Sequence, residues 1–316
     1  MKKWILMAGA ALSLMLALAG CTSSSENSTS DQKLTIVTTF YPMYDFTKNV
    51  AGSQADISML IQSGTEPHDY EPSAKDIAKI EQADVFVYNS EDMETWVPSV
   101  LKNLDTKKTT VIDASKGIDL LEGTEEEHEH EDEDAHHEEE HHHAHDPHVW
   151  LSPVLAQKEV ANIAEGLEKA DTKNAKTYQE NAKAYTQKLA ELDQSYQTAF
   201  QDAKNRTFVT QHAAFAYLAQ QYDLKQVPIA GLSPDEEPSP KRLAELKTYV
   251  EKQHIPVIYF EEISSPKIAQ TLADEAGVKT AVLNPLESLT SEQQEQGEDY
   301  ISIMQKNLEA LKLSIK

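Results

Sequence analysis

The feature that most constrains the fold of this chain is an alternation of short strand-like runs with helical segments, which occurs twice. Short runs rich in Val, Ile, Thr and Phe are typical of buried strands. Strands that alternate with helices predict parallel sheets with helices on both faces, so we expect an α/β fold of two similar lobes. The expected strands are residues 34–40, 56–61, 84–89 and 109–113, then 207–210, 225–229, 257–260 and 280–283.

Helices are expected between these strands, and one long helix is expected between the two lobes. From Ala175 to Ala203 apolar residues recur three and four positions apart, which predicts one continuous helix. A coiled-coil dimer is the alternative, but Ala and Tyr fill many of the seam positions, so we expect the helix to lie across both lobes. The predicted domains are residues 33–170, a linking helix at 171–204, and residues 205–316. The other expected helices are 42–50, 73–83, 95–104, one from about 153, and 213–222, 240–253, 266–276 and 291–313.

The N-terminal segment has the pattern of an export signal. Lys2 and Lys3 precede an apolar run at 4–18, and small residues stand just before Cys21, the only cysteine in the sequence. An ordinary secretory signal is one interpretation, but the segment resembles a bacterial lipoprotein signal, in which the cysteine is lipidated. We therefore expect a signal peptide at 1–20, lipidation of Cys21, and a flexible Ser/Thr-rich tether at 21–32. The mature protein would then be extracytoplasmic and anchored to the cell membrane by its lipid.

The charge balance excludes some functions and points to one unusual segment. With 53 acidic and 28 basic residues the net charge is −25, which argues against a nucleic-acid partner. One cysteine excludes an internal disulfide framework and a Cys-rich zinc finger. Residues 124–145 hold eleven acidic residues and eight of the twelve histidines, so we expect a disordered loop that binds divalent metal weakly, rather than a sensor or a spacer. Its histidines are His128, His130, His136, His137, His141, His142, His143 and His145.

The four remaining histidines differ in their positions relative to the expected strands. His254 ends a helix, where a cation favours the helix dipole, and we interpret it as structural. His68 and His212 follow strands, and His148 lies between the fourth strand and the next helix. The carboxyl ends of the strands in open α/β sheets bind ligands, and the last strand is followed by Glu287. Three imidazoles and a carboxylate suit tetrahedral zinc.

Several linked motifs give the chain a family resemblance. They are EPHDYEP (66–72), DPHVWLSP (146–153), TQHAAFAYLA (210–219) and the acidic, His-rich insertion before DPH. Over residues 33–316 the chain resembles the solute-binding lipoproteins of bacterial zinc ABC importers, within the zinc- and manganese-binding family once called adhesin lipoproteins. The resemblance implies two α/β lobes bridged by a long helix, with Zn(II) in the cleft between them. It implies the ligands His68, His148, His212 and Glu287, with water as the family's alternative at the last position.

The resemblance also implies partners and leaves alternatives open. The partners would be an ABC permease and its ATPase subunit, and we expect a monomer without the extra C-terminal metal-binding domain of some relatives. A manganese importer component is one alternative, but manganese relatives replace one histidine with a carboxylate, so His212 favours zinc. A surface adhesin is the other alternative. We expect no enzyme, because a zinc hydrolase needs an open coordination position, and none of the expected helices carries a His-Glu-x-x-His motif.

Overall fold

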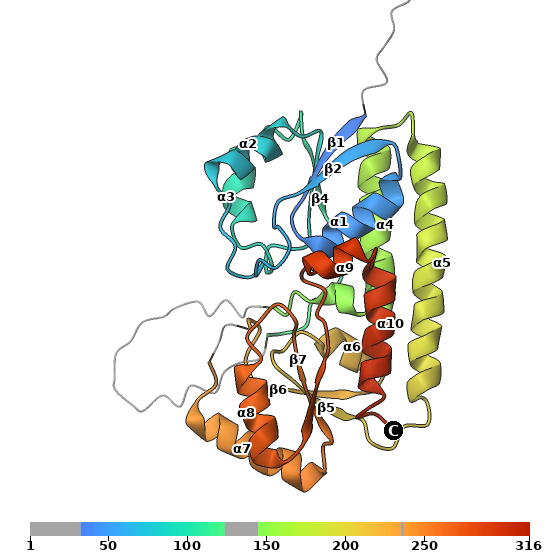
Figure 1. The fold of residues 1–316 in the computed structure, drawn as a ribbon. Coiled ribbons are helices and arrows are strands. Elements are labelled where there is room, and N and C mark those ends of the chain that lie inside the picture. Colours follow the sequence, from blue (N-terminus) through green and yellow to red (C-terminus); the bar gives the residue numbers. More distant parts are fainter. Residues whose placement is uncertain (1–32, 124–144, 235–236) are drawn as a thin grey trace, which may run out of the picture. The chain divides into compact units, whose positions relative to one another are not determined.

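Two four-stranded parallel sheets form the framework of the chain in the computed structural model, which describes residues 33–123, 145–234 and 237–316 (Figure 1). This confirms the predicted α/β class. The expected signal peptide, Cys21, the tether and seven of the eight histidines of the acidic segment lie outside the described residues. None of the described helices is both long enough and apolar enough to cross a membrane.

The first sheet has the strand order β2-β1-β3-β4, and every adjacent pair is parallel. The second sheet repeats this arrangement in the order β6-β5-β7-β8. In both sheets the strand order reverses beside the first strand in sequence, which is where α/β folds bind ligands. The strands are β1 (Leu34–Thr38), β2 (Ala55–Met59), β3 (Val85–Tyr88), β4 (Thr110–Asp113), β5 (Thr207–Thr210), β6 (Lys225–Pro228), β7 (Val257–Phe260) and β8 (Lys279–Val282).

Helix boundaries follow local capping signals in the sequence. A capping box stands at Ser73, where the expected helix 73–83 begins: the Ser73 hydroxyl accepts from the backbone N–H of Asp76, and the Asp76 carboxylate accepts from the backbone N–H of Ser73. Ser152 and Ser239 cap helices that begin with proline. The helices are α1 (Tyr41–Ala51), α2 (Ala74–Gln82), α3 (Val97–Leu101), the 3-10 turn η1 (Val149–Leu151), α4 (Pro153–Ala170), α5 (Ala175–Phe200), α6 (Ala216–Gln221), α7 (Pro240–Gln253), α8 (Lys267–Ala276), α9 (Ser291–Glu295) and α10 (Tyr300–Leu311).

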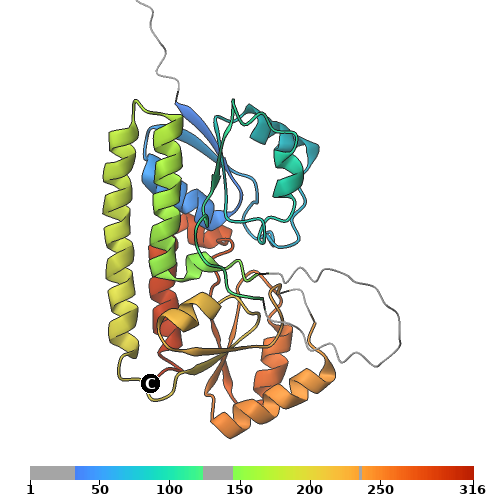
Figure 2. The ribbon, with the colours of Figure 1, turned by 180° about the vertical axis from the view of Figure 1, so that it is seen from behind.

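The long helix α5 packs against other helices of the same chain. Its apolar stripe is buried against α1, α4 and α10, and both ribbon views show it running beside α4 and α10 (Figures 1 and 2). The stripe is therefore used within the chain, which removes the reason for a coiled-coil dimer. One continuous apolar core includes side chains of both sheets and of α5. Because α5 and both sheets share this core, α5 contributes to the packing of both lobes. The domain boundaries at residues 170 and 204 stay a prediction.

Two expected helices differ from the structure in ways that a turn explains. The predicted single helix at 291–313 is wrong, because Gly297 has φ +73° and separates α9 from α10. Asp299 then begins α10, its carboxylate accepting from the backbone N–H of Ser302 at 2.8 Å. The helix expected from 213 begins at Ala216, since the preceding residues form the turn that carries His212.

Gly166 marks a close approach of α4 to β4, and this contact gives a prediction about stability. A Cβ at Gly166 would lie 2.5 Å from Cγ1 of Ile112 and closer still to its Cδ1. Gly166→Ala gains up to about 1 kcal/mol of helix propensity, but overpacking costs about 1–3 kcal/mol. We expect a net loss of about 1 kcal/mol in the free energy of unfolding, measured by urea denaturation. Ile112→Val, which removes Cδ1, should recover part of that loss, and a more stable Gly166→Ala variant would contradict this packing.

Candidate metal centre

The structure brings together the four side chains that the sequence nominated as ligands. His68 lies in the loop after β2, His148 directly precedes η1, His212 follows β5, and Glu287 follows β8. One ligand atom from each lies within 4.8 Å of all the others. Among the described residues this is the one group of three or more His, Cys, Asp or Glu side chains with such spacing.

The imidazoles converge on one carboxylate oxygen. The Nε2 atoms of His68, His148 and His212 lie 3.4, 3.3 and 3.2 Å from Oε1 of Glu287. The Nε2 atoms of His68 and His148 are 3.1 Å apart. His148, His212 and Glu287 are buried, whereas the His68 side chain is 11% exposed and forms the outer edge of the group. A metal ion would therefore be held inside the fold and reached past His68.

The strand order explains why these segments meet. His212 follows β5, at the point where the order of the second sheet reverses, and Glu261 follows the neighbouring strand β7. At the matching point of the first sheet, Asn89 follows β3, and its Nδ2 donates to the carbonyl of Pro147 at 2.9 Å. That bond anchors the segment that carries His148. The second sheet thus places a candidate ligand at its reversal point, and the first sheet anchors the segment of another at the matching point.

Two carboxylates that sequence reasoning missed hold the buried imidazoles in orientation. Asp146 Oδ1 accepts from Nδ1 of His148 at 2.7 Å and from its backbone N–H at 2.9 Å. Glu261 Oε1 contacts Nδ1 of His212, and its other oxygen accepts from the Ser264 hydroxyl at 2.9 Å. A carboxylate on Nδ1 leaves Nε2 free to bind metal and makes it a stronger donor. Asp146 could have been found in the DPH motif, and Glu261 from its place directly after a strand.

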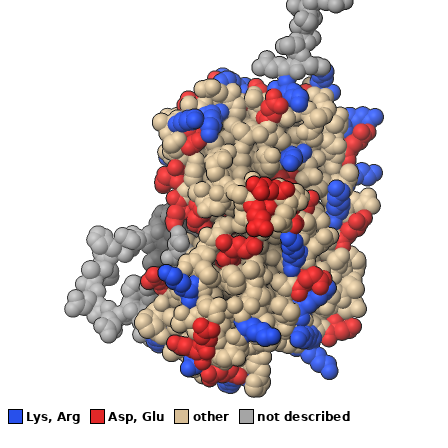
Figure 3. Space-filling model, in the orientation of Figure 1, with Lys and Arg blue, Asp and Glu red and all other residues tan. Residues whose placement is uncertain are grey.

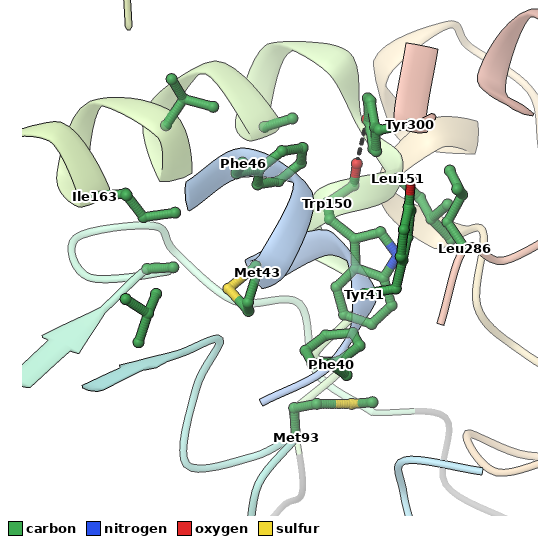
Figure 4. Packing of buried hydrophobic residues seen from close by; sticks show 14 of the residues in the cluster. Phe40, Tyr41, Met43, Phe46, Met93, Trp150, Leu151, Ile163, Leu286 and Tyr300 are labelled. Carbon is green, nitrogen blue, oxygen red and sulfur yellow. Dashed lines mark hydrogen bonds between the residues drawn. The ribbon is translucent and has the colours of Figure 1, made fainter. Parts of the chain in front are cut away.

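The loop that carries Glu287 is fixed by a left-handed residue and by a tryptophan. Leu286 has φ +61° although it is not glycine, and its backbone N–H donates to Oδ1 of Asn284 at 2.7 Å. Such backbone strain is found at functional sites that the surroundings hold in place. Trp150 Nε1 donates to the carbonyl of Pro285 at 2.8 Å, and Figure 4 shows the Trp150 carbonyl accepting from the Tyr300 hydroxyl. Trp150 therefore ties the segment of His148 to the segment of Glu287.

The loop of His68 is held by the second half of the chain. The backbone N–H of Gly64 donates to the Ser288 hydroxyl at 2.8 Å, and Gln294 Nε2 donates to the Ser63 hydroxyl at 2.5 Å. Within the loop, the Glu66 carboxylate accepts from the backbone N–H of His68 at 3.1 Å. Burial and the nearby charge of Glu287 raise the pKa of Glu66 to about 8. The loop thus brings a further carboxyl group to the edge of the site.

The charges in the site shift its pKa values in opposite directions. Burial alone would raise the pKa of Glu287, but His212, with hydrogen bonds from the histidines, holds it well below its usual range. Burial alone would lower the pKa of His212 and of His148, but Glu261 and Glu287 raise the first, and Asp146 and Glu287 raise the second. For His68 burial prevails and lowers the pKa. In the metal-free site these charges therefore favour the protonated form of the buried imidazoles, and a metal must compete with that proton.

The orphaned polar atoms of the site fit a metal ion. Glu287 Oε2 is buried and has no hydrogen-bond partner among the described residues, and the buried His212 Nε2 faces only Oε1 of the same carboxylate, at 3.2 Å. Buried polar atoms are normally well paired, so these two atoms need an explanation. A cation bound by three imidazole nitrogens and a carboxylate would satisfy them, and this donor set suits tetrahedral zinc.

The two other described histidines, His254 and His145, are not part of the group formed by His68, His148, His212 and Glu287. His254 caps the end of α7 in a left-handed conformation, φ +54°, and is exposed. His145 is exposed, pairs with Glu122 in an isolated antiparallel bridge, and has Nδ1 at 3.2 Å from Asp92. Weak metal binding by His145 and by the other histidines of the acidic segment stays a prediction.

Fold and site together define a two-lobed α/β protein with a buried transition-metal site between its sheets. The model of the ZnuA family, described as zinc-uptake complex component A, periplasmic, matches residues 36–313. The chain belongs to this family. It is 57% identical over 303 residues to the high-affinity zinc uptake system protein ZnuA of Bacillus subtilis, covering 95% of this chain and 94% of that protein.

Streptococcal relatives are similar in sequence and in structure. The chain is 54% identical to the zinc-binding lipoprotein AdcA of Streptococcus pneumoniae, over 95% of this chain but only 60% of that protein's length. The crystal structure of the Zn(II)-bound ZnuA-like domain of Streptococcus pneumoniae AdcA has a TM-score of 0.77 and 53% identity. It covers 90% of this chain and 99% of that domain, so the match extends across both lobes.

Proposed function

We propose that this protein captures Zn(II) outside the cytoplasm and delivers it to a membrane importer. The observation that carries the proposal is the convergence of three Nε2 atoms, from His68, His148 and His212, within 3.4 Å of Oε1 of Glu287. Membership of a zinc-uptake family supports it. With Glu287 as the fourth ligand no coordination position remains for a reacting water, which fits a carrier rather than a hydrolase.

Zinc is preferred over manganese because of the donor atoms. Manganese sites are rich in oxygen ligands, whereas three of the four donors here are imidazole nitrogens. The carboxylates on His148 and His212 fix the ring tautomers that present Nε2 to the metal. Affinity alone would favour copper, so geometry and metal supply contribute to selection.

The partners and the anchor are proposed on the same basis. An ABC permease and its ATPase would receive the zinc, and a lipid on Cys21 would hold the protein at the membrane. A nucleic-acid partner does not fit the net charge of −25. On the face drawn in Figure 3, acidic and basic side chains are interspersed, and its described residues form no broad basic area.

Domain roles follow from the same proposal. Residues 33–170 and 205–316 would act as the two lobes that share the zinc, with 171–204 as the linking helix. The acidic, His-rich segment at 124–145 would gather zinc near the site, because many imidazoles bind divalent metal weakly and the negative charge attracts cations. The packing of α5 against both halves favours small movements of the ligand loops over a wide hinge motion.

Growth at limiting zinc tests this function. A strain that lacks the protein should grow poorly in zinc-depleted medium and recover with added zinc. The wild-type gene should restore growth, and a His148→Ala gene should not, because that variant loses a buried nitrogen ligand. Normal growth of the deletion strain, or rescue by manganese instead of zinc, would contradict the proposal. Since attachment to a host surface does not depend on zinc supply, the same experiment separates transport from adhesion.

A further inference from the structure

Tyr217 is a buried tyrosine of α6 whose position connects the segments of two ligands. Its side chain is 3% exposed and packs with Ile118 and Val149 in a small apolar cluster that is separate from the main core. Helix α6 begins four residues after His212, and it packs against η1, which begins directly after His148. Tyr217 therefore lies where the two halves of the chain meet beside the metal centre.

The hydroxyl of Tyr217 bridges two backbone segments. It donates to the carbonyl of Asp146 at 2.6 Å and accepts from the backbone N–H of Leu121 at 2.8 Å. The backbone N–H of Asp146 donates in turn to the carbonyl of Leu121 at 2.8 Å. The three bonds close a ring that joins the chain on either side of residues 124–144 to α6.

Asp146 connects the Tyr217 hydroxyl to the proposed ligand His148. Its backbone is fixed by Tyr217 and Leu121, and its side chain binds both the backbone N–H and Nδ1 of His148. Without the Tyr217 hydroxyl, the buried carbonyl of Asp146 and the N–H of Leu121 would lose their partner. The carboxylate that orients His148 would then be held less firmly.

We propose that Tyr217 is a positioning residue for zinc, which sets the place of His148 relative to His212 through Asp146. The inference rests on the proposed zinc-binding function. It differs from a role in folding alone, because it concerns the geometry of the bound metal. Ligands that are held in place before binding lose less entropy on binding and keep the metal longer.

The variant Tyr217→Phe tests this role, since it keeps the ring in its cluster and removes only the hydroxyl. We expect zinc affinity to fall about three- to tenfold, less than the ten- to hundredfold typical of losing a partner that contacts the ligand directly. The visible absorption spectrum of the Co(II)-substituted protein, which reports coordination geometry, should change. Tyr196→Phe is the matched control, because the buried Tyr196 hydroxyl donates to the carbonyl of Met304 at 2.7 Å, within the α5 and α10 packing.

A second measurement needs no variant and covers the case in which Tyr217→Phe folds poorly. Coupling between two sites is reciprocal, so zinc should slow hydrogen exchange at the Leu121 amide, whose acceptor is Tyr217. Unchanged zinc affinity and cobalt spectrum in Tyr217→Phe, with a loss of thermal stability like that of Tyr196→Phe, would overturn the inference. Unchanged exchange at Leu121 would also overturn it. Failure of the wild-type chain to bind zinc would instead refute the proposed function.

Discussion

Replacing His148 or His212 with alanine is expected to weaken zinc binding by at least about 100-fold, more than the usual loss when a partner outside the metal's ligands is removed. Both imidazoles are fully buried, so no other side chain can take their place. His68→Ala should also cost at least about tenfold, although this ligand is partly exposed and water can reach its position. Glu287→Ala should weaken zinc binding less than replacing either buried histidine. Removing the Glu287 carboxylate also removes a charge that favours the proton on His212, so zinc competes with that proton more easily.

Competition with a chromophoric chelator measures these affinities best in a chain that lacks residues 124–144, where weaker sites cannot contribute. His254→Asn is the control: it removes an exposed imidazole and keeps a residue that tolerates the left-handed conformation at the end of α7. Wild-type affinity in any of the three variants His68→Ala, His148→Ala or His212→Ala would refute the ligand assignment.

As the pH is lowered, zinc affinity is expected to fall at a higher pH than it would if the ligands had the pKa of free imidazole. Zinc binds only the neutral imidazole, and the carboxylates of Glu261 and Glu287 raise the pKa of His212 well above its ordinary value of 6.5. Glu261→Gln should lower that pKa, and so move the fall in affinity to lower pH. At high pH the same variant should bind zinc about 10–100-fold more weakly, because the ring is no longer oriented by a carboxylate.

The stability of the protein should depend on pH in opposite ways without and with zinc. In the metal-free protein, protonated His212 contributes stability that is fully present below pH 6.5 and is lost as the pH rises through the raised pKa. Bound zinc requires the neutral ring, so the rise in melting temperature that zinc causes should grow with pH.

Isothermal titration with zinc at several pH values checks the affinity trend in the wild-type chain, in Glu261→Gln and in the exposed-surface control Glu275→Gln. Thermal unfolding of the same chains with and without zinc checks the stability trend. Glu275→Gln makes the same change in net charge at an exposed position of α8 and should match the wild type. A Glu261→Gln profile that coincides with the wild-type profile would show that Glu261 neither favours the proton on His212 nor orients its ring.

The sequence was sufficient to predict the fold class because each strand carries its own local signal. The runs at 207–210 and 257–260 have the predicted boundaries, since β-branched and aromatic residues end where polar residues begin. The break between α9 and α10 was missed because a helical apolar pattern continues through it, although Gly297 marked it. Strand order could not be predicted, because it depends on which strands pair in three dimensions.

The four candidate ligands could be identified in the sequence for a physical reason that extends only in part to their partners. His68, His148, His212 and Glu287 are residue types that bind zinc, and they follow strands or lie in family motifs. Glu261 is one of 53 acidic residues, so its type alone does not distinguish it. The role of Tyr217 depends on a hydroxyl that meets two backbone groups distant in sequence, and no residue pattern specifies that contact.

Zinc K-edge X-ray absorption on the chain loaded with less than one equivalent of zinc tests the central claim most directly. We predict four-coordinate zinc, with three imidazole nitrogens and one carboxylate oxygen at about 2.0–2.2 Å. The spectrum should be unchanged when residues 124–144 are deleted, because all four proposed ligands lie outside that segment. A six-coordinate, oxygen-rich shell, or a spectrum that changes on the deletion, would contradict the assignment of His68, His148, His212 and Glu287 as the zinc site.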